Sequence, residues 1–149
     1  MPRQSGESAR TSTLLRQLFK APNLNSFFEN NEQAFLTPSF SEYLNRLCEE
    51  RGVRRECAIR RSGIERAYGY QLFNGTRKPS RDKVLQIALA LRLGVDETQK
   101  LLQIAEKSPL YPRIKRDAAV LFCLSHGRSV LETQVLLDDL GLRLLDQGL

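Results

Sequence analysis

Residues 54–80 read RRECAIRRSGIERAYGYQLFNGTRKPS, and this stretch decides how the chain folds. It predicts two short helices, over residues 54–61 and 65–73, separated by a tight three-residue turn around Gly63. The turn needs a residue that tolerates a positive φ, and glycine does so at no steric cost. Two short helices joined in this way form a helix-turn-helix, whose second helix protrudes from the surface.

The residues on either side of this stretch predict further short helices. Before it, Ser39 and Glu42 form the capping-box pattern that begins a helix, and Gly52 ends that helix. After it, Pro79-Ser80 begins a helix that Gly94 ends.

The C-terminal part of the sequence predicts three more helices. Asp96 and Gln99 repeat the capping pattern for a helix that reaches about residue 106. A further helix spans about residues 113–125, and Ser129 and Glu132 form a capping box for the last one. Because no segment shows the alternation of polar and apolar residues that is typical of a strand, we expect an all-α protein.

We expect four parts along the chain. Residues 1–12 are polar and predict a disordered tail. Residues 13–37 predict an N-terminal helical arm, rich in phenylalanine. The helix-turn-helix domain, a bundle of five helices, occupies residues 38–107, and a C-terminal helical hairpin occupies residues 108–149.

The positive charge of the chain is concentrated around the helix-turn-helix. The whole chain has a formal net charge of +6. Residues 51–83 contain ten basic residues and only three acidic ones, whereas the rest of the chain carries one more acidic residue than basic ones. The ten are Arg51, Arg54, Arg55, Arg60, Arg61, Arg66, Arg77, Lys78, Arg81 and Lys83. Such a local concentration is typical of a surface that binds a polyanion.

The sequence argues against a membrane protein, a metalloprotein and an enzyme. No apolar run approaches the ~20 residues that span a bilayer, and residues 1–12 lack the apolar core of a signal peptide, so we expect a cytoplasmic protein without a membrane partner. Cys48, Cys57 and Cys123 include no CxxC pair, and His126 is the only histidine, so we expect no metal and no cofactor. The sequence contains no Walker-type loop, no GxSxG and no nucleophile with an evident base.

The central part of the chain resembles a known family. Residues 63–75 (GIERAYGYQLFNG), then Arg77-Lys78-Pro79-Ser80, Ile87-Ala88-Leu89-Ala90-Leu91 and Val95-Asp96-Glu97, resemble the lambda-repressor-like (Xre-type) helix-turn-helix family. This resemblance covers about residues 40–105. It implies a lambda-repressor-like five-helix bundle that binds double-stranded DNA and regulates transcription, with the second helix of the motif in the major groove. The longer stretch of residues 40–140 also resembles small Xre-like proteins of Gram-positive bacteria. This wider resemblance adds no information about function.

The resemblance implies two groups of DNA contacts. Base edges are contacted by Arg66, Ala67 and Tyr70. Phosphates are contacted by Arg55, Asn74, Thr76, Arg77 and Lys78. An arginine at position 66 could form a bidentate pair with guanine, whereas phosphate contacts add affinity without sequence preference.

The sequence departs from the family pattern inside the motif. The family usually carries an aliphatic residue at Gly69 and a small residue at Ile59, and here the sizes are exchanged. We expect Ile59 to fill the space that Gly69 leaves, so that the core volume stays roughly constant. Tyr68 could contact DNA, bind a partner or cover the core, and for Tyr70 we favour an exposed contact.

The C-terminal hairpin predicts a homodimer. Two-fold dimers are the usual way in which this motif reads two half-sites. The helix after Ser129 carries more apolar residues than one helix of a hairpin needs. They are Val130, Leu131, Val135, Leu136, Leu137 and Leu140. Nearby, we expect Arg113, Lys115 and Arg116 to form a solvated face and Asp117 to support its helix start electrostatically.

Two other functions remain open. A protein-interaction adaptor could keep this fold and hold a protein partner with Tyr68, Tyr70 and the phenylalanines of the arm. An antitoxin-like protein would bind both a partner protein and DNA. A steep salt dependence of DNA binding would separate the regulator from the adaptor.

Overall fold

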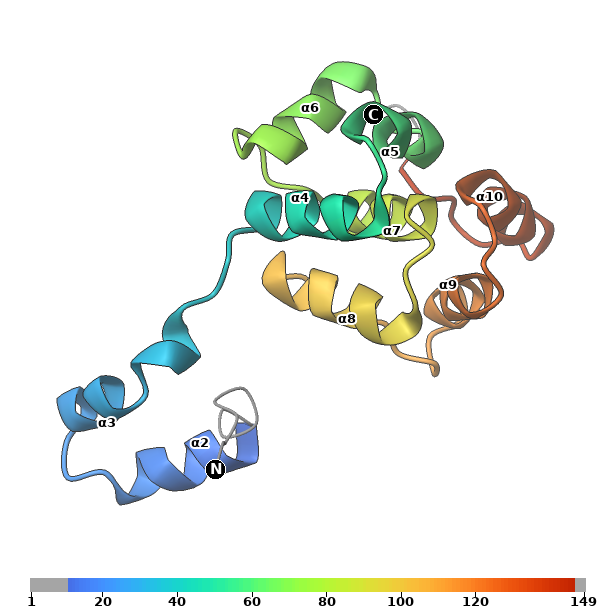
Figure 1. Cartoon of the computed structure of the whole chain (residues 1–149). Coiled ribbons are helices and arrows are strands. Elements are labelled where there is room, and N and C mark those ends of the chain that lie inside the picture. The colour runs from blue at the N-terminus through green and yellow to red at the C-terminus, as the bar shows by residue number, and fades with distance from the viewer. Residues whose placement is uncertain (1–10, 147–149) are drawn as a thin grey trace. The chain divides into compact units, whose positions relative to one another are not determined.

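A computed structural model describes residues 11–146 of the chain, and within them every regular element is a helix (Figure 1). None of these helices is long and apolar enough to cross a membrane. Most of the predicted tail at residues 1–12 lies outside the described residues, but Thr11 and Ser12 open the first described helix. The chain divides into two compact units, Met1–Thr37 and Pro38–Leu149, which we describe separately.

Within its described residues, 11–37, the first unit contains two short helices and one turn of 3₁₀ helix. These are α2 (Thr11–Lys20), α3 (Leu24–Asn30) and η1 (Glu32–Phe35). The Asn23 side chain caps α3 by accepting a hydrogen bond from the Ser26 amide at 2.8 Å. Three phenylalanines, Phe27, Phe28 and Phe35, pack together with ring centroids 5.2–6.0 Å apart. Within the described part of this unit only Phe27 is buried.

The second unit is a bundle of seven described helices, of which α7 is central and the most completely buried. The seven are α4 (Phe40–Arg51), α5 (Arg55–Ser62), α6 (Arg66–Asn74), α7 (Arg81–Ala90), α8 (Val95–Ile104), α9 (Lys115–Ser125) and α10 (Val130–Asp139). Every residue of α7 after Arg81 is buried, and α7 contacts α5, α8, α9 and α10. Burial therefore extends around the whole of α7. In Figure 1, α5 and α6 form one end of this unit and α9 and α10 form one side.

Most of the predicted helix ends are confirmed. Ser39 with Glu42, and Ser129 with Glu132, form complete capping boxes, and Gly52 ends α4. α7, however, ends at Ala90, before the predicted Gly94. The shorter helix leaves Gly94 outside α7, where it opens the next helix.

The predicted capping pattern of Asp96 and Gln99 is wrong. Gly94 is the N-cap of α8, and its amide donates to the Glu97 carboxylate at 3.1 Å. The Gln99 amide instead bridges to the backbone of Leu110, donating to its carbonyl at 2.9 Å and accepting from its N–H at 2.8 Å. Gln99 therefore fixes the loop after α8 rather than the start of the helix.

The prediction that Arg116 is solvated is also wrong, since it is a partly buried link between α9 and α7. Its guanidinium donates to both carboxylate oxygens of Asp82, at 3.0 and 2.9 Å, and the two side chains are 12% and 7% exposed. It also donates to the carbonyls of Arg143 and Leu144. Burial acts to raise the pKa of Asp82, but the hydrogen bonds and charge of Arg116, together with smaller contributions from Asp146 and Arg143, hold that pKa below its usual value. Arg113 and Lys115, in contrast, are exposed as predicted.

Asp117 forms the second link between these two helices. Its carboxylate accepts two hydrogen bonds from Arg81, at 3.1 and 3.0 Å, and a third from the Tyr111 amide at 3.0 Å. Asp117 is buried. Its main partner is thus a distant arginine, and not only the start of its own helix as we expected.

Candidate nucleic-acid interface

Helices α5 and α6 form the helix-turn-helix, each displaced by one residue from its predicted position. Gly63 closes α5 with φ +75°, in the left-handed region that favours glycine. The Ser62 hydroxyl fixes the turn from inside, donating to the Ile59 carbonyl at 2.6 Å and accepting from the Ile64 amide at 3.1 Å. The predicted turn around Gly63 is therefore confirmed.

Glu65 caps the N-terminus of α6, a role that the sequence reading did not assign. Its carboxylate accepts hydrogen bonds from the amides of Tyr68 at 3.0 Å and Ala67 at 3.2 Å. These two bonds, helped by the charge of Arg77, hold the pKa of Glu65 below its usual value. Because the Glu65 carboxylate already accepts hydrogen bonds from these two N–H groups, they are not free to bind a partner. The start of α6 therefore presents side chains to a partner.

The exchange of sizes between Gly69 and Ile59 is confirmed as a direct contact. Gly69 is buried on α6, and a Cβ atom placed on it would lie 2.6 Å from Cγ2 and 2.9 Å from Cγ1 of Ile59. Real Cβ atoms essentially never approach a neighbour this closely. The side chain of Ile59 therefore fills the volume that any larger residue at position 69 would need.

We expect Gly69→Val to lower the free energy of unfolding by about 1–3 kcal/mol, because the new side chain overpacks against Ile59. Urea denaturation of the full chain measures this loss. The matched control is the double variant Gly69→Val with Ile59→Ala, which restores the usual order of sizes. This double variant should lose less free energy of unfolding than the sum of the losses in the two single variants. Strict additivity, or an unchanged Gly69→Val, would show that the exchange is not a packing compensation.

The three residues expected to contact bases all lie on α6, but they are not equally accessible. Arg66 and Ala67 occupy its first turn and are exposed. Tyr70 is half-buried against the core, so it is less accessible than we expected. The Arg66 guanidinium lies over the Tyr70 ring, 5.8 Å from its centroid. Arg66 and Ala67 are thus the most accessible part of this face.

The last residue of α6 and the loop after it carry four of the five residues expected to contact phosphate, and all four are exposed. They are Asn74, Thr76, Arg77 and Lys78. The Asn74 side chain is engaged within the loop, accepting from the amide and the hydroxyl of Thr76 at 3.0 and 2.8 Å. It shapes the loop while the cations beside it point outward. The fifth residue, Arg55, is exposed at the start of α5.

Tyr68 packs against one cation of this loop and one cation of α7. Its half-buried ring has the Arg77 guanidinium 4.3 Å from its centroid and the Lys83 ammonium 5.2 Å from it. Tyr68 could contact DNA, bind a partner or cover the core, and these contacts favour a packing role. The ring supports Arg77, a residue that we expect to contact phosphate.

The predicted cluster of ten basic residues divides into two groups. Four of the ten form ion pairs, Arg51 with Glu97, Arg54 with Glu56, Arg81 with Asp117 and Lys83 with Asp146. The other six are exposed and take part in no ion pair within residues 11–146. These six, which we call the basic surface, are Arg55, Arg60, Arg61, Arg66, Arg77 and Lys78. They lie on α5, at the start of α6 and in the loop after it, so the basic surface surrounds the helix-turn-helix.

A hollow of about 370 Å³ lies within the basic surface. It is lined by Glu56, Ile59, Arg60, Ile64, Arg66 and Tyr70. Arg60 and Arg66 thus line the same hollow, together with the isoleucines Ile59 and Ile64. Arg60 was among the ten cations, but the sequence reading gave it no contact, because its helical position alone does not show that it faces the same hollow as Arg66.

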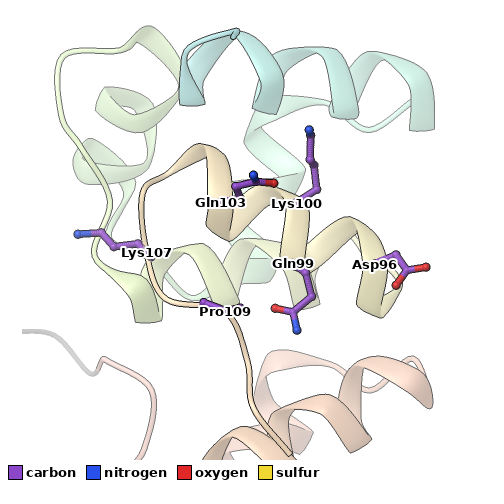
Figure 2. Close-up of a pocket in the computed structure, with 6 residues that line it drawn as sticks. All are labelled: Asp96, Gln99, Lys100, Gln103, Lys107 and Pro109. Carbon is purple, nitrogen blue, oxygen red and sulfur yellow. The ribbon is translucent and has the colours of Figure 1, made fainter. Parts of the chain in front are cut away.

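A larger hollow of about 580 Å³ lies on the outer face of α8 (Figure 2). Figure 2 shows Lys100 and Lys107 pointing in different directions, and Gln99 is committed to the Leu110 backbone. The hollow therefore has no convergent set of polar groups. Across the described residues, no three histidine, cysteine or acidic side chains lie close enough to hold a metal ion.

Comparison with known proteins identifies the same segment. Residues 39–101 match the model of a family described as a helix-turn-helix domain, which belongs to the Xre/lambda-repressor-like clan. The matched segment runs from the cap of α4 into α8 and contains the whole basic surface. No curated protein and no solved structure matches the chain. A helix-turn-helix domain is typical of DNA-binding regulators in general.

Proposed function

We propose that this chain, whose residues 39–101 form a helix-turn-helix domain, is a sequence-specific DNA-binding regulator of transcription that inserts α6 into the major groove. The proposal extends to a lambda-repressor-like arrangement of α4 to α8 and to repression as the mode of regulation. The observation that carries it is the basic surface. Within a segment of ten cations, the six of the basic surface are exposed and outside the ion pairs of the described chain, whereas the four paired cations are Arg51 on α4, Arg81 and Lys83 on α7, and Arg54 at the start of α5.

Each part of the site has a distinct role in this proposal. Arg66, Ala67 and Tyr70 contact base edges, with Arg66 as the main specificity residue. Phosphates are bound by Arg55, Asn74, Thr76, Arg77 and Lys78. Arg60 and Arg61 on α5 add positive charge on the same surface. Affinity therefore comes mainly from the phosphate contacts, and sequence choice from the first turn of α6.

The salt dependence of duplex binding tests this proposal. Binding to a labelled duplex, followed by fluorescence anisotropy, should weaken with a log–log slope of about −0.9 for each phosphate contacted. Lys78→Ala should reduce the magnitude of that slope by about 1 and lower affinity for all sequences alike. Lys100→Ala on α8, far along the chain from the basic surface, is the matched control and should change neither value. Absence of duplex binding at low salt would refute the proposal.

The N-terminal unit favours a second candidate function, a protein-interaction adaptor. Six large apolar side chains in this unit are exposed, namely Leu15, Phe19, Leu24, Phe28, Phe35 and Leu36. An adaptor that keeps the fold without binding DNA, or an antitoxin-like protein that binds both, would use this unit for its partner. The adaptor predicts no salt-dependent duplex binding, so the titration above separates it from the regulator.

A further inference from the structure

The segment after α10, residues 142–146, has a fixed place in the second unit. The Gln134 side chain on α10 bridges to the backbone of Leu145, accepting from its N–H at 2.8 Å and donating to its carbonyl at 3.1 Å. The Leu145 side chain is fully buried. α10 itself packs inward through Val130 and Leu137, so these two residues, which we expected at a dimer interface, belong to the core. The segment is therefore anchored by α10 and by the core.

This placement brings the Asp146 carboxylate to the start of α7. The Ser80 hydroxyl donates to its Oδ2 atom at 2.7 Å, and the Nζ atom of Lys83 lies 3.6 Å from the same oxygen. The Lys83 side chain is only 7% exposed, whereas the Asp146 side chain is 32% exposed. Asp146 is thus the more accessible member of this ion pair.

The two partners of this carboxylate lie beside residues that we expect to contact phosphate. Ser80 follows Lys78 by two positions. The Lys83 ammonium lies 5.2 Å from the centroid of the Tyr68 ring, and the Arg77 guanidinium lies 4.3 Å from the same centroid. Lys83 is therefore next to the basic surface but is withheld from it by its ion pair and its burial.

We propose that the contact of Asp146 with Ser80 and Lys83 is autoinhibitory, an inference that rests on the proposed function. The carboxylate accepts from the hydroxyl and pairs with the ammonium as a phosphate oxygen of DNA would. It also adds a negative charge beside the loop that carries Arg77 and Lys78. A phosphate at this place must displace the carboxylate, because two anions that share the same partners repel each other. Duplex binding therefore costs the ion pair between Lys83 and Asp146.

The attachment of the segment does not depend on the Asp146 carboxylate. Gln134 and the buried Leu145 already fix the segment, and Arg116 donates to the Leu144 carbonyl at 2.8 Å. The Asp146 side chain can thus turn towards solvent while the backbone of the segment stays in place. The inhibitory element is one side chain, and its removal leaves the packing of α10 intact.

The affinity of the full chain for a labelled duplex, measured by fluorescence anisotropy, tests this inference. Asp146→Asn keeps an oxygen that can accept from Ser80 but removes the negative charge. We expect it to tighten duplex binding by about fivefold, the upper end for the loss of a partly exposed ion pair. Asp146→Ala should give a similar gain.

The matched control is Asp138→Asn, which removes the same charge from an exposed position on α10 that takes part in no ion pair within residues 11–146. It should change affinity by less than about twofold, because charges in solvent are screened over about 10 Å at 0.1 M salt. In a Lys83→Gln background, Asp146→Asn should do no more than this control, since the cation through which it acts is absent.

The outcomes separate this inference from the proposed function. Duplex binding with equal effects of Asp146→Asn and Asp138→Asn would overturn the autoinhibitory contact and leave the regulator intact. A full gain from Asp146→Asn in the Lys83→Gln background would do the same. Absence of duplex binding by both the unmodified chain and the Asp146→Asn variant would overturn both proposals.

Discussion

Replacing Arg116 with leucine is expected to lower the free energy of unfolding by about 3 kcal/mol, the largest effect that we expect from a single substitution on α9. The Asp82 side chain is only 7% exposed, and the substitution removes the guanidinium that forms a bidentate ion pair with its carboxylate. It also removes the donors to the carbonyls of Arg143 and Leu144. Arg143 still lies 3.3 Å from Asp82, but its side chain is 71% exposed, so it compensates only in part.

Urea denaturation followed by circular dichroism measures this loss. Lys115→Leu, at the neighbouring exposed position, is the control and should change the free energy of unfolding by less than about 0.5 kcal/mol. The double variant Arg116→Leu with Asp82→Leu removes both partners, so it should be more stable than Arg116→Leu alone. If Arg116→Leu behaves like Lys115→Leu, the ion pair does not hold α9 against α7.

Replacing Arg66 with alanine is expected to remove most of the sequence preference at one base position. Arg66 is the exposed arginine in the first turn of α6, and a bidentate pair with guanine contributes about 1–3 kcal/mol of discrimination. The ratio of affinities for a preferred and a substituted duplex should therefore fall by about 5- to 150-fold. Competition binding with duplexes that differ at single positions measures this ratio.

Arg77→Ala is the matched control, since it removes the same side chain from the loop beside α6. Arg77 lies over the Tyr68 ring, where we expect it to contact a phosphate. Its loss should weaken binding to all duplexes by a similar factor and leave their ratio unchanged. The assignment of the two roles fails if Arg66→Ala preserves the ratio or if Arg77→Ala alters it.

Features that depend on neighbours in the sequence could be predicted. The capping boxes at Ser39 and Ser129, the turn at Gly63 and the two helices around it all follow from residues within about four positions. The contact between Ile59 and Gly69 could also be predicted, because the family resemblance supplied the side-chain sizes expected at the two positions. These local features were enough to locate the helix-turn-helix.

Features that depend on distant partners could not be predicted. Arg116 and Asp82 are 34 positions apart, and helical periodicity shows only that a charged residue lies on a given face, not what that face meets. For the same reason the sequence could not separate the ion-paired cations Arg81 and Lys83 from the exposed cations of the basic surface. The basic surface is therefore smaller than the cluster of ten that composition indicates, and closer to α6.

The partial burial of Tyr70 is a further feature that could not be predicted from the sequence. Its spacing places it one turn after Arg66, which favours an outward position. The ring nevertheless packs against the core. How far such a ring is buried depends on which residues pack against it in the fold, and helical periodicity does not describe them.

The central claim is that the exposed first turn of α6 reads DNA sequence, and selection from a random duplex library tests it most directly. The full chain, used at low salt over several rounds, should enrich a short motif, and the Arg66→Ala variant should bind duplexes but fail to enrich the same motif. The claim would be contradicted if the full chain bound no duplex at low salt, or if the Arg66→Ala variant enriched the identical motif.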